Sequence, residues 1–315
     1  MDAGIPRTLI DAVRFFKDAD NCREFMVTIR WPDGIKCPTC GSEKVGFLAN
    51  QGRWQCSSKH PKRQFSVKVG TIFEDSPIGL DKWLPAVWLL VNCKNGISSY
   101  EVARDLDVTQ KTAWFMLQRI RLAMQSGTFE KIHGQVEADE TFIGGLARFM
   151  HKADRARKIT GTGGAGKAVV MGLLDRHTGE VRVKHVPNVR RETLHAEIRK
   201  HVEAGSEMFT DEYVGYRGLD PDYVHNVINH AEAYVRGNVH TNRIENFWSC
   251  LKRGLKGTYI SVEPFHLFRY LDEQAFRFNE RKTTDAARFV EALSNVTGRR
   301  LTYKQLIGER PSTAA

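Results

Sequence analysis

Three carboxylates stand where they could bind metal ions together. Asp139 lies in VEADETFIGG and Asp211 in MFTDEYVGY, and each ends a short apolar run that predicts a strand. Glu245 lies in HTNRIENFWSCLKRG, which predicts a helix. Carboxylates from strand ends and a helix can hold two divalent ions, which activate a water or a sugar hydroxyl and stabilise the leaving oxygen of a phosphodiester. If these side chains converge, the site would cut and join nucleic acid.

Other acids near the same strand ends compete with these three as ligands. Glu137, Asp139 and Thr141 share one face of a regular strand, whereas Glu140 points to the other face. An acid inside a buried strand costs stability unless its charge is satisfied, and metal binding is one way to satisfy it. Glu245 is the least specified of the three by its local context. The competing acids are Glu137, Glu140, Asp175 and Glu212.

The predicted helix around Glu245 also carries basic residues. Ser249 and Lys252 follow Glu245 at i+4 and i+7, which places them on the same face. Arg253 and Lys256 extend a cationic surface beside that face. We therefore predict that this helix contacts DNA next to the carboxylates.

Four residues with the chemistry of zinc ligands cluster in the N-terminal third. Cys37 and Cys40 lie in CPTCG, and their spacing lets both thiolates reach one ion from a tight turn. Cys56 and then His60 follow in CSSKH, and four such ligands match tetrahedral zinc in a closed, structural site. About 40 residues with little core could hardly fold without the ion. The alternative is three free core cysteines and a surface histidine.

Residues 98–124 predict two helices joined by a short turn. Ser98 or Ser99 can cap the first helix, and Thr109 can cap the second. In a helix-turn-helix the start of the second helix enters the major groove of DNA. The residues presented to DNA would be Thr109, Gln110, Lys111 and Thr112. An ordinary helical hairpin is the alternative.

A glycine-rich segment at residues 161–167, GTGGAGK, nearly matches a phosphate-binding loop. Ala168 replaces the hydroxyl that should ligate magnesium, a basic run precedes the segment, and a predicted strand follows it where a helix is required. We therefore expect no nucleotide cofactor. The segment predicts a basic connection between two strands, either a solvated loop or an arm that contacts phosphates. The candidate arm residues are Arg155, Arg157 and Lys158.

Charge and hydropathy restrict the class of protein. The net charge of +10 and a pI near 9.3 favour a polyanionic partner, most often nucleic acid. The longest apolar stretch, residues 83–91, is far shorter than the roughly 20 residues of a membrane span. The N-terminus has no basic region followed by an apolar core, so we expect no secretory signal. The clustered cysteines favour a metal site in a reducing cytoplasm over a disulfide framework.

Strands mixed with helices predict an α/β or α+β chain made of several parts. We expect an N-terminal helical segment at 1–33, a zinc ribbon at 34–75 and a helix-turn-helix-like module at 76–130. A catalytic domain should follow at 131–282, and a C-terminal helical tail at 283–315.

Several blocks of the sequence resemble one protein family. The chain is similar to bacterial insertion-sequence transposases of the DDE class, in the subgroup with an N-terminal zinc ribbon (ISXO-type). The similarity spans nearly the whole chain, and its blocks include RWPDGIKCPTCGS, VEADETFIGG, FTDEYVGY, HTNRIENFWSCLKRGLKGTY and YLDEQAFRFNER. Many relatives have a second CxxC in the ribbon, where this chain has C-x3-H.

The resemblance implies an RNase H-like catalytic domain, with Asp139 and Asp211 on neighbouring strands and Glu245 on a following helix. It implies two Mg2+ (or Mn2+) ions at these acids, shared by Asp139, and one structural Zn2+. It also implies that Lys252 assists near the scissile DNA end. The expected partners are transposon ends and target DNA, bound by a homo-oligomer without a membrane or nucleotide cofactor. The expected location is the bacterial cytoplasm, associated with the nucleoid.

The predicted reaction is hydrolysis at the transposon end, followed by transfer of the freed 3′-hydroxyl into target DNA. Two other functions stay open at this point. One is a DNA-binding regulator, or an inactive transposase relic, which keeps the ribbon and the helix-turn-helix. The other is an RNase H-like nuclease or resolvase that cuts without joining.

Overall fold

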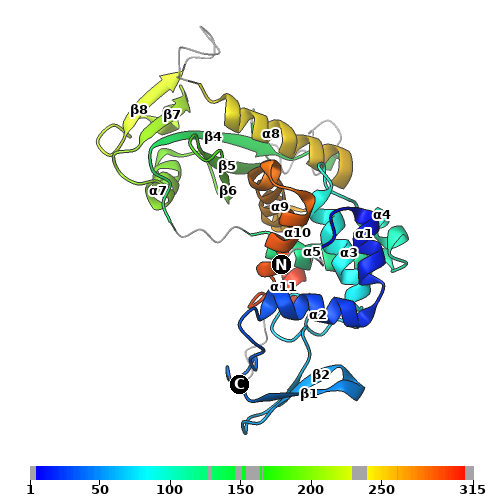
Figure 1. The fold of residues 1–315 in the computed structure, drawn as a ribbon. Coiled ribbons are helices and arrows are strands. Elements are labelled where there is room, and N and C mark those ends of the chain that lie inside the picture. Colours follow the sequence, from blue (N-terminus) through cyan, green and yellow to red (C-terminus); the bar gives the residue numbers. More distant parts are fainter. Residues whose placement is uncertain are drawn as a thin grey trace. The chain divides into compact units, whose positions relative to one another are not determined.

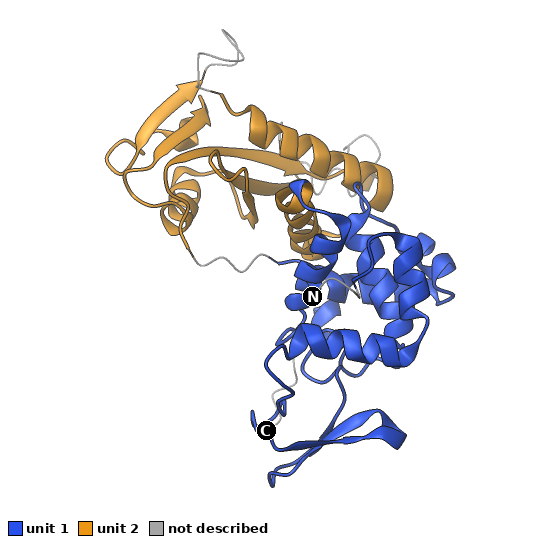
Figure 2. Cartoon of the chain, viewed as in Figure 1, with its two compact units in different colours: residues 1–125, 282–315 blue, residues 126–281 orange. Residues whose placement is uncertain are grey.

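The chain forms two compact units, coloured separately in Figure 2. One combines residues 1–125 with 282–315, and the other comprises residues 126–281. Residues 282–315 therefore belong to the same unit as the N-terminal segments, whereas the sequence predicts a separate tail. The computed structural model describes residues 5–125, 130–145, 151–153, 164, 166–228, 240–260 and 262–308.

A small antiparallel sheet lies within the first unit. Its strands, in order, are β1 (Val45–Leu48), β2 (Arg53–Cys56) and β3 (Gln64–Phe65). The core of this ribbon is small. Trp54 is buried, with its ring centroid 5.8 Å from that of Trp31. So few apolar contacts contribute little stability, which is why a further constraint on the ribbon is expected.

The rest of the first unit is helical. Asp18 accepts hydrogen bonds from the backbone amides of Asp20 and Asn21, and so caps a helix. Ser98 forms a capping box with Glu101. The helices are α1 (Leu9–Phe16), α2 (Ala19–Arg30), α3 (Leu80–Asn92), α4 (Ser99–Asp105), α5 (Gln110–Ala123), α10 (Asp285–Ser294) and α11 (Tyr303–Ile307).

The C-terminal helix α10 completes the core of this unit through one aromatic side chain. The Phe289 ring is fully buried, and its centroid lies 5.7 Å from that of Phe16, 5.9 Å from that of Phe25 and 5.1 Å from that of Trp88. These three rings come from α1, α2 and α3. The N-terminal helices therefore depend on the C-terminal segment for their packing.

The second unit is built on a five-stranded mixed sheet in the order β6-β5-β4-β7-β8 (Figure 1). Strands β4, β5 and β6 pair antiparallel in sequence, and β7 and β8 run parallel to β4. The strands are β4 (Gln135–Ile143), β5 (Ala168–Asp175), β6 (Val181–Val186), β7 (Glu207–Asp211) and β8 (Val224–Ile228).

Helices cover both faces of this sheet: α7 (Arg191–His201) one face, and α8 (Asn242–Gly254) with α9 (Leu267–Asn279) the other. Strand β5 shows the consequence. Its Met171 packs in the α7 core, whereas Val170 packs in the α8 and α9 core. A strand buried on both faces is apolar almost throughout, as AVVMGLLD is.

The strand order and directions are those of an RNase H-like fold. The predicted fold class, α/β with a small ribbon ahead of an RNase H-like domain, is confirmed. Among the described helices, none combines the length and the hydropathy that a membrane span requires.

Candidate active site and metal cluster

Asp139 and Asp211 end up beside each other on two parallel strands. The pairing of β4 with β7 places Glu137 opposite Phe209. Asp139 and Asp211 each lie two residues further along, so the alternation of the strands turns both acids to the same face. That face carries α8. The sheet therefore brings two of the three predicted acids together.

Glu245 lies in the first turns of α8, on the same side of the sheet. The Thr241 hydroxyl donates a hydrogen bond of 3.1 Å to Glu245 Oε1. One turn further, Trp248 Nε1 donates a hydrogen bond of 2.9 Å to Asp139 Oδ2. This bond ties the helix to the strand, so the helix carries Glu245 beside Asp139.

Burial and the two neighbouring acids raise the cost of ionising Asp139. Burial raises the pKa of Asp139 to about 6, and the charges of Asp211 and Glu245 contribute to the rise, while the Trp248 hydrogen bond opposes it. Among the described residues, the ligand atoms of the cysteine cluster all lie within 4.8 Å of one another, whereas the carboxylate oxygens of these three acids do not. Carboxylates that repel one another at one place suit divalent cations, which would remove the repulsion.

Glu140 also interacts electrostatically with this group. Burial raises its pKa to about 7, with contributions from Asp211 and Asp139. The fully buried Tyr216 donates a hydrogen bond of 2.5 Å to Glu140 Oε2. One oxygen of Glu140 is thus bound to the protein, but the residue remains within electrostatic range of the site.

The other competing acids have different roles. Glu137 is fully buried and pairs with Arg176 at 2.9 Å. Asp175 Oδ1 accepts the backbone amide of His177 at 2.7 Å, in the turn after β5. Glu212 is exposed. None of these contacts involves Asp139, Asp211 or Glu245.

The predicted basic residues follow Glu245 along the chain. Lys252 is half-buried on α8, two turns after Glu245, and Arg253 is exposed next to it. Lys256 is exposed in a π-helical turn, η4 (Leu255–Tyr259), that continues α8. Their roles at DNA stay predictions.

Gly172 makes room for the Trp248 ring. It lies opposite Asp139 in the β4–β5 pairing, and a Cβ on it would meet Trp248 Cη2 at 2.7 Å. We expect Gly172→Ala to push the indole off Asp139 and to lower the free energy of unfolding by about 1–3 kcal/mol, since overpacking a core has that cost. Urea denaturation of the purified protein measures the change.

Gly145→Ala is the matched control for this substitution. No atom lies within 4 Å of a Cβ built on Gly145, which is in the same unit. Its unfolding curve should match the wild type. Equal stability of Gly172→Ala and Gly145→Ala would contradict the proposed packing.

Cys37, Cys40, Cys56 and His60 form a metal-binding cluster whose ligand atoms all lie within 4.8 Å of one another. The Sγ atoms of Cys40 and Cys56 are 3.7 Å apart, and Cys37 Sγ lies 3.5 Å from His60 Nε2. A tetrahedral zinc ion with Zn–S bonds near 2.3 Å requires sulfurs about 3.8 Å apart, so the spacing fits zinc. His60 Nδ1 donates to the Pro61 carbonyl at 2.7 Å, which directs Nε2 to the cluster.

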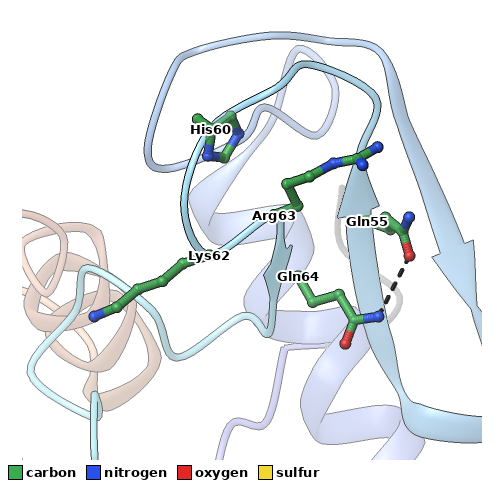
Figure 3. Close-up of a pocket in the computed structure, with 5 residues that line it drawn as sticks. All are labelled: Gln55, His60, Lys62, Arg63 and Gln64. Carbon is green, nitrogen blue, oxygen red and sulfur yellow. Dashed lines mark hydrogen bonds between the residues drawn. The ribbon is translucent and has the colours of Figure 1, made fainter.

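A shallow pocket of about 580 Å3 lies beside this cluster (Figure 3). Arg63 is fixed there by a 3.0 Å hydrogen bond from its Nε to the Cys56 carbonyl. The amides of Gln55 and Gln64 are hydrogen-bonded across two strands. None of the five lining residues is acidic, so the pocket suits an anion. They are Gln55, His60, Lys62, Arg63 and Gln64.

The predicted DNA-reading residues lie at the start of α5. Thr109 caps the helix through the Thr112 amide, as predicted. The Gln110 amide donates to Ser99 Oγ at 2.8 Å, and Lys111 Nζ lies 5.5 Å from the centroid of the Tyr303 ring. Helices α4 and α5 thus form the predicted pair, but Gln110 already has a partner within the protein.

The predicted basic arm lies outside the described residues. Arg155, Arg157 and Lys158 fall in the connection between β4 and β5, so the structure does not test them. The segment after the glycines is strand β5, as predicted, and not the helix that a nucleotide-binding loop requires.

Sequence reasoning missed the residues that hold the acids in place. Trp248 and Gly172 act through packing between α8 and β5, and Glu137 acts through the start of α8. The glycine in the apolar run AVVMGLLD was an available signal, because a strand glycine often marks a close approach.

Comparison with known proteins finds similarity in both units. A model of the ISXO2-like transposase domain matches residues 131–279, and one of the transposase zinc-ribbon domain matches residues 17–58. An uncharacterized protein in transposable element ISH50 of Halobacterium salinarum is 28% identical over 255 residues, 77% of this chain and 85% of that protein. An uncharacterized transposase-like protein of Haemophilus influenzae is 36% identical over 95 residues, 30% of this chain and 76% of that protein.

A solved structure is also similar. It is the simian T-cell lymphotropic virus intasome in complex with PP2A regulatory subunit B56 gamma, with a TM-score of 0.28 and 11% identity. The match covers 59% of this chain and 66% of that chain. The sequence similarities extend to an archaeal element, beyond the bacterial elements that the sequence predicted.

Proposed function

This chain belongs to the ISXO2-like transposases with an N-terminal transposase zinc ribbon, and we propose that it cuts and joins DNA at transposon ends. The reaction is metal-dependent hydrolysis of a phosphodiester, followed by transfer of the 3′-hydroxyl into target DNA. The observation that carries this proposal is the position of Asp139 beside Asp211, under the helix that bears Glu245.

Asp139, Asp211 and Glu245 are the residues that would hold two Mg2+ or Mn2+ ions. When bound, such ions activate the attacking oxygen and stabilise the leaving one. Asp139 has a pKa of about 6, so it is mostly ionised at neutral pH and available as a ligand. Trp248 restricts its orientation through the bond to Oδ2.

The chain's own cations would place the DNA. Lys252 follows Glu245 on α8, from where its ammonium group would bind a phosphate near the scissile bond. The exposed Arg253 and Lys256 would bind flanking phosphates. These contacts orient the phosphodiester, which lowers the barrier by fixing the reacting groups.

The first unit would recognise the transposon end. A structural zinc at the four-ligand cluster would hold the ribbon, and the adjacent pocket with Lys62 and Arg63 would bind phosphates. At the start of α5, Lys111 and Thr112 would approach the major groove. We expect the active form to be a homo-oligomer that holds both ends.

A cleavage assay tests this function. The purified protein is incubated with a labelled duplex that carries an end flanking its gene, in Mg2+ or in EDTA. We expect a nick at the end in Mg2+ only. Binding of the end without cleavage in Mg2+ or Mn2+ would support the DNA-binding regulator instead.

A further inference from the structure

Glu137 lies on β4, two residues before Asp139, and its side chain is 0% exposed. A buried carboxylate is costly unless charged and hydrogen-bonding partners surround it. Glu137 has such partners on both oxygens, and they come from the residue that follows β5 and from the start of α8.

The first oxygen, Oε1, belongs to an ion pair with Arg176, the residue directly after β5. Arg176 Nε lies 2.9 Å from it, and His240 Nδ1 lies 3.4 Å away. The Arg176 guanidinium stacks 3.6 Å from the centroid of the Phe209 ring on β7, and it donates to the His240 carbonyl. The pair therefore links β4, β7 and the end of β5 with the residues that lead into α8.

The second oxygen, Oε2, caps α8. It accepts the backbone amides of Arg243 at 3.1 Å and Ile244 at 3.0 Å. These are among the first amides of the helix, which have no partner inside it. The N-cap residue, Thr241, makes no side-chain capping bond. A negative charge here also complements the helix dipole.

The cap that Glu137 provides also fixes the position of Glu245. It directly follows Ile244, so the capped turn is the turn that carries the third acid. A helix rotates by about 100° per residue, so a small slip at this turn would swing Glu245 away from Asp139. We infer that Glu137 is a positioning residue, a buried clamp that sets where Glu245 stands relative to Asp139. This inference rests on the proposed metal-dependent function.

Amide hydrogen exchange on the metal-free protein tests the clamp. Glu137→Gln keeps the shape but removes the charge, so we expect the amides of Arg243 and Ile244 to exchange about tenfold faster or more. We also expect Mg2+ to raise the Tm of this variant less than that of the wild type. Arg176→Lys, which keeps the charge beside Glu137 but loses the planar guanidinium, should give intermediate values.

Ile198→Ala is the control for general loss of stability. Ile198 is a buried residue of α7 and packs in the core on the opposite face of the sheet. An equal loss of protection at Arg243 and Ile244 in this control would overturn the clamp. So would wild-type protection and a wild-type Mg2+ response in Glu137→Gln. If the wild type itself shows no Mg2+ response and no cleavage, the proposed function fails, while the exchange rates still decide whether Glu137 holds the helix.

Discussion

Asp139→Asn should abolish strand cleavage and at the same time stabilise the metal-free protein. Loss of one metal-binding carboxylate should remove several kcal/mol of transition-state stabilisation, and about 4 kcal/mol corresponds to roughly a thousandfold in rate. The gain in stability has a separate cause. The pKa of Asp139 is raised by burial, from 3.8 to about 6, so its ionised form is disfavoured in the folded state.

The sign of this effect sets its pH dependence. Because its pKa is raised, Asp139 binds its proton more tightly in the folded protein than in the unfolded chain. Proton binding at Asp139 therefore stabilises the fold below pH 4, and this contribution is lost as pH rises through 6. Asp139→Asn has no carboxylate to ionise, so its stability does not fall in this way as pH rises. At pH 7.5 we expect the free energy of unfolding of Asp139→Asn to be about 3 kcal/mol higher than that of the wild type, because each pKa unit corresponds to about 1.4 kcal/mol. At pH 4 we expect little difference.

Urea denaturation in EDTA at the two pH values, together with cleavage in Mg2+, measures both effects. Asp175→Asn is the control, because Asp175 accepts turn amides and lies outside the proposed site. It should cleave normally and gain no stability. Cleavage by Asp139→Asn at the wild-type rate would contradict the assigned role.

Cys37→Ser should release the metal and unfold the ribbon. Structural zinc sites in small domains contribute about 10 kcal/mol or more of apparent folding free energy, and the ribbon has a small core to replace it. We expect wild-type protein to hold about one zinc per chain and the variant none. The variant should also lose end binding, because the pocket with Lys62 and Arg63 adjoins the cluster.

Metal analysis and circular dichroism measure these changes, and Cys93→Ser is the matched control. Cys93 ends α3 and lies outside the cluster, so its variant should keep both zinc and end binding. His60→Cys should also keep zinc, because a thiolate is an equally good fourth ligand. A zinc-free wild type with a folded ribbon would contradict the assignment.

The sequence predicts strands at Asp139 and Asp211, and the parallel pairing of β4 with β7 brings the two acids together, although Asp139 lies inside β4 and only Asp211 ends its strand. Their role as metal ligands stays a prediction. The sequence also predicts the caps at Ser98 and Thr109 from equally local signals. These strands and caps can be predicted because each is determined by residues within a few positions of it.

Contacts between distant segments were beyond such reasoning. Glu137 reads as one more acid on the Asp139 face, and only the tertiary structure places its oxygens against the start of α8, more than 100 residues later. Phe289 likewise joins a core formed by the N-terminal helices. Such pairings depend on the register of the whole fold, which no single segment encodes.

Strand transfer tests the central claim most directly. Purified protein is given a precut transposon end with a free 3′-hydroxyl and a supercoiled plasmid, in Mg2+. We predict covalent joining of the labelled 3′ end to the plasmid by the wild type, and none by Asp139→Asn. A wild type that nicks uncut ends but never joins the precut end to the plasmid would contradict the transposase account and identify a nuclease.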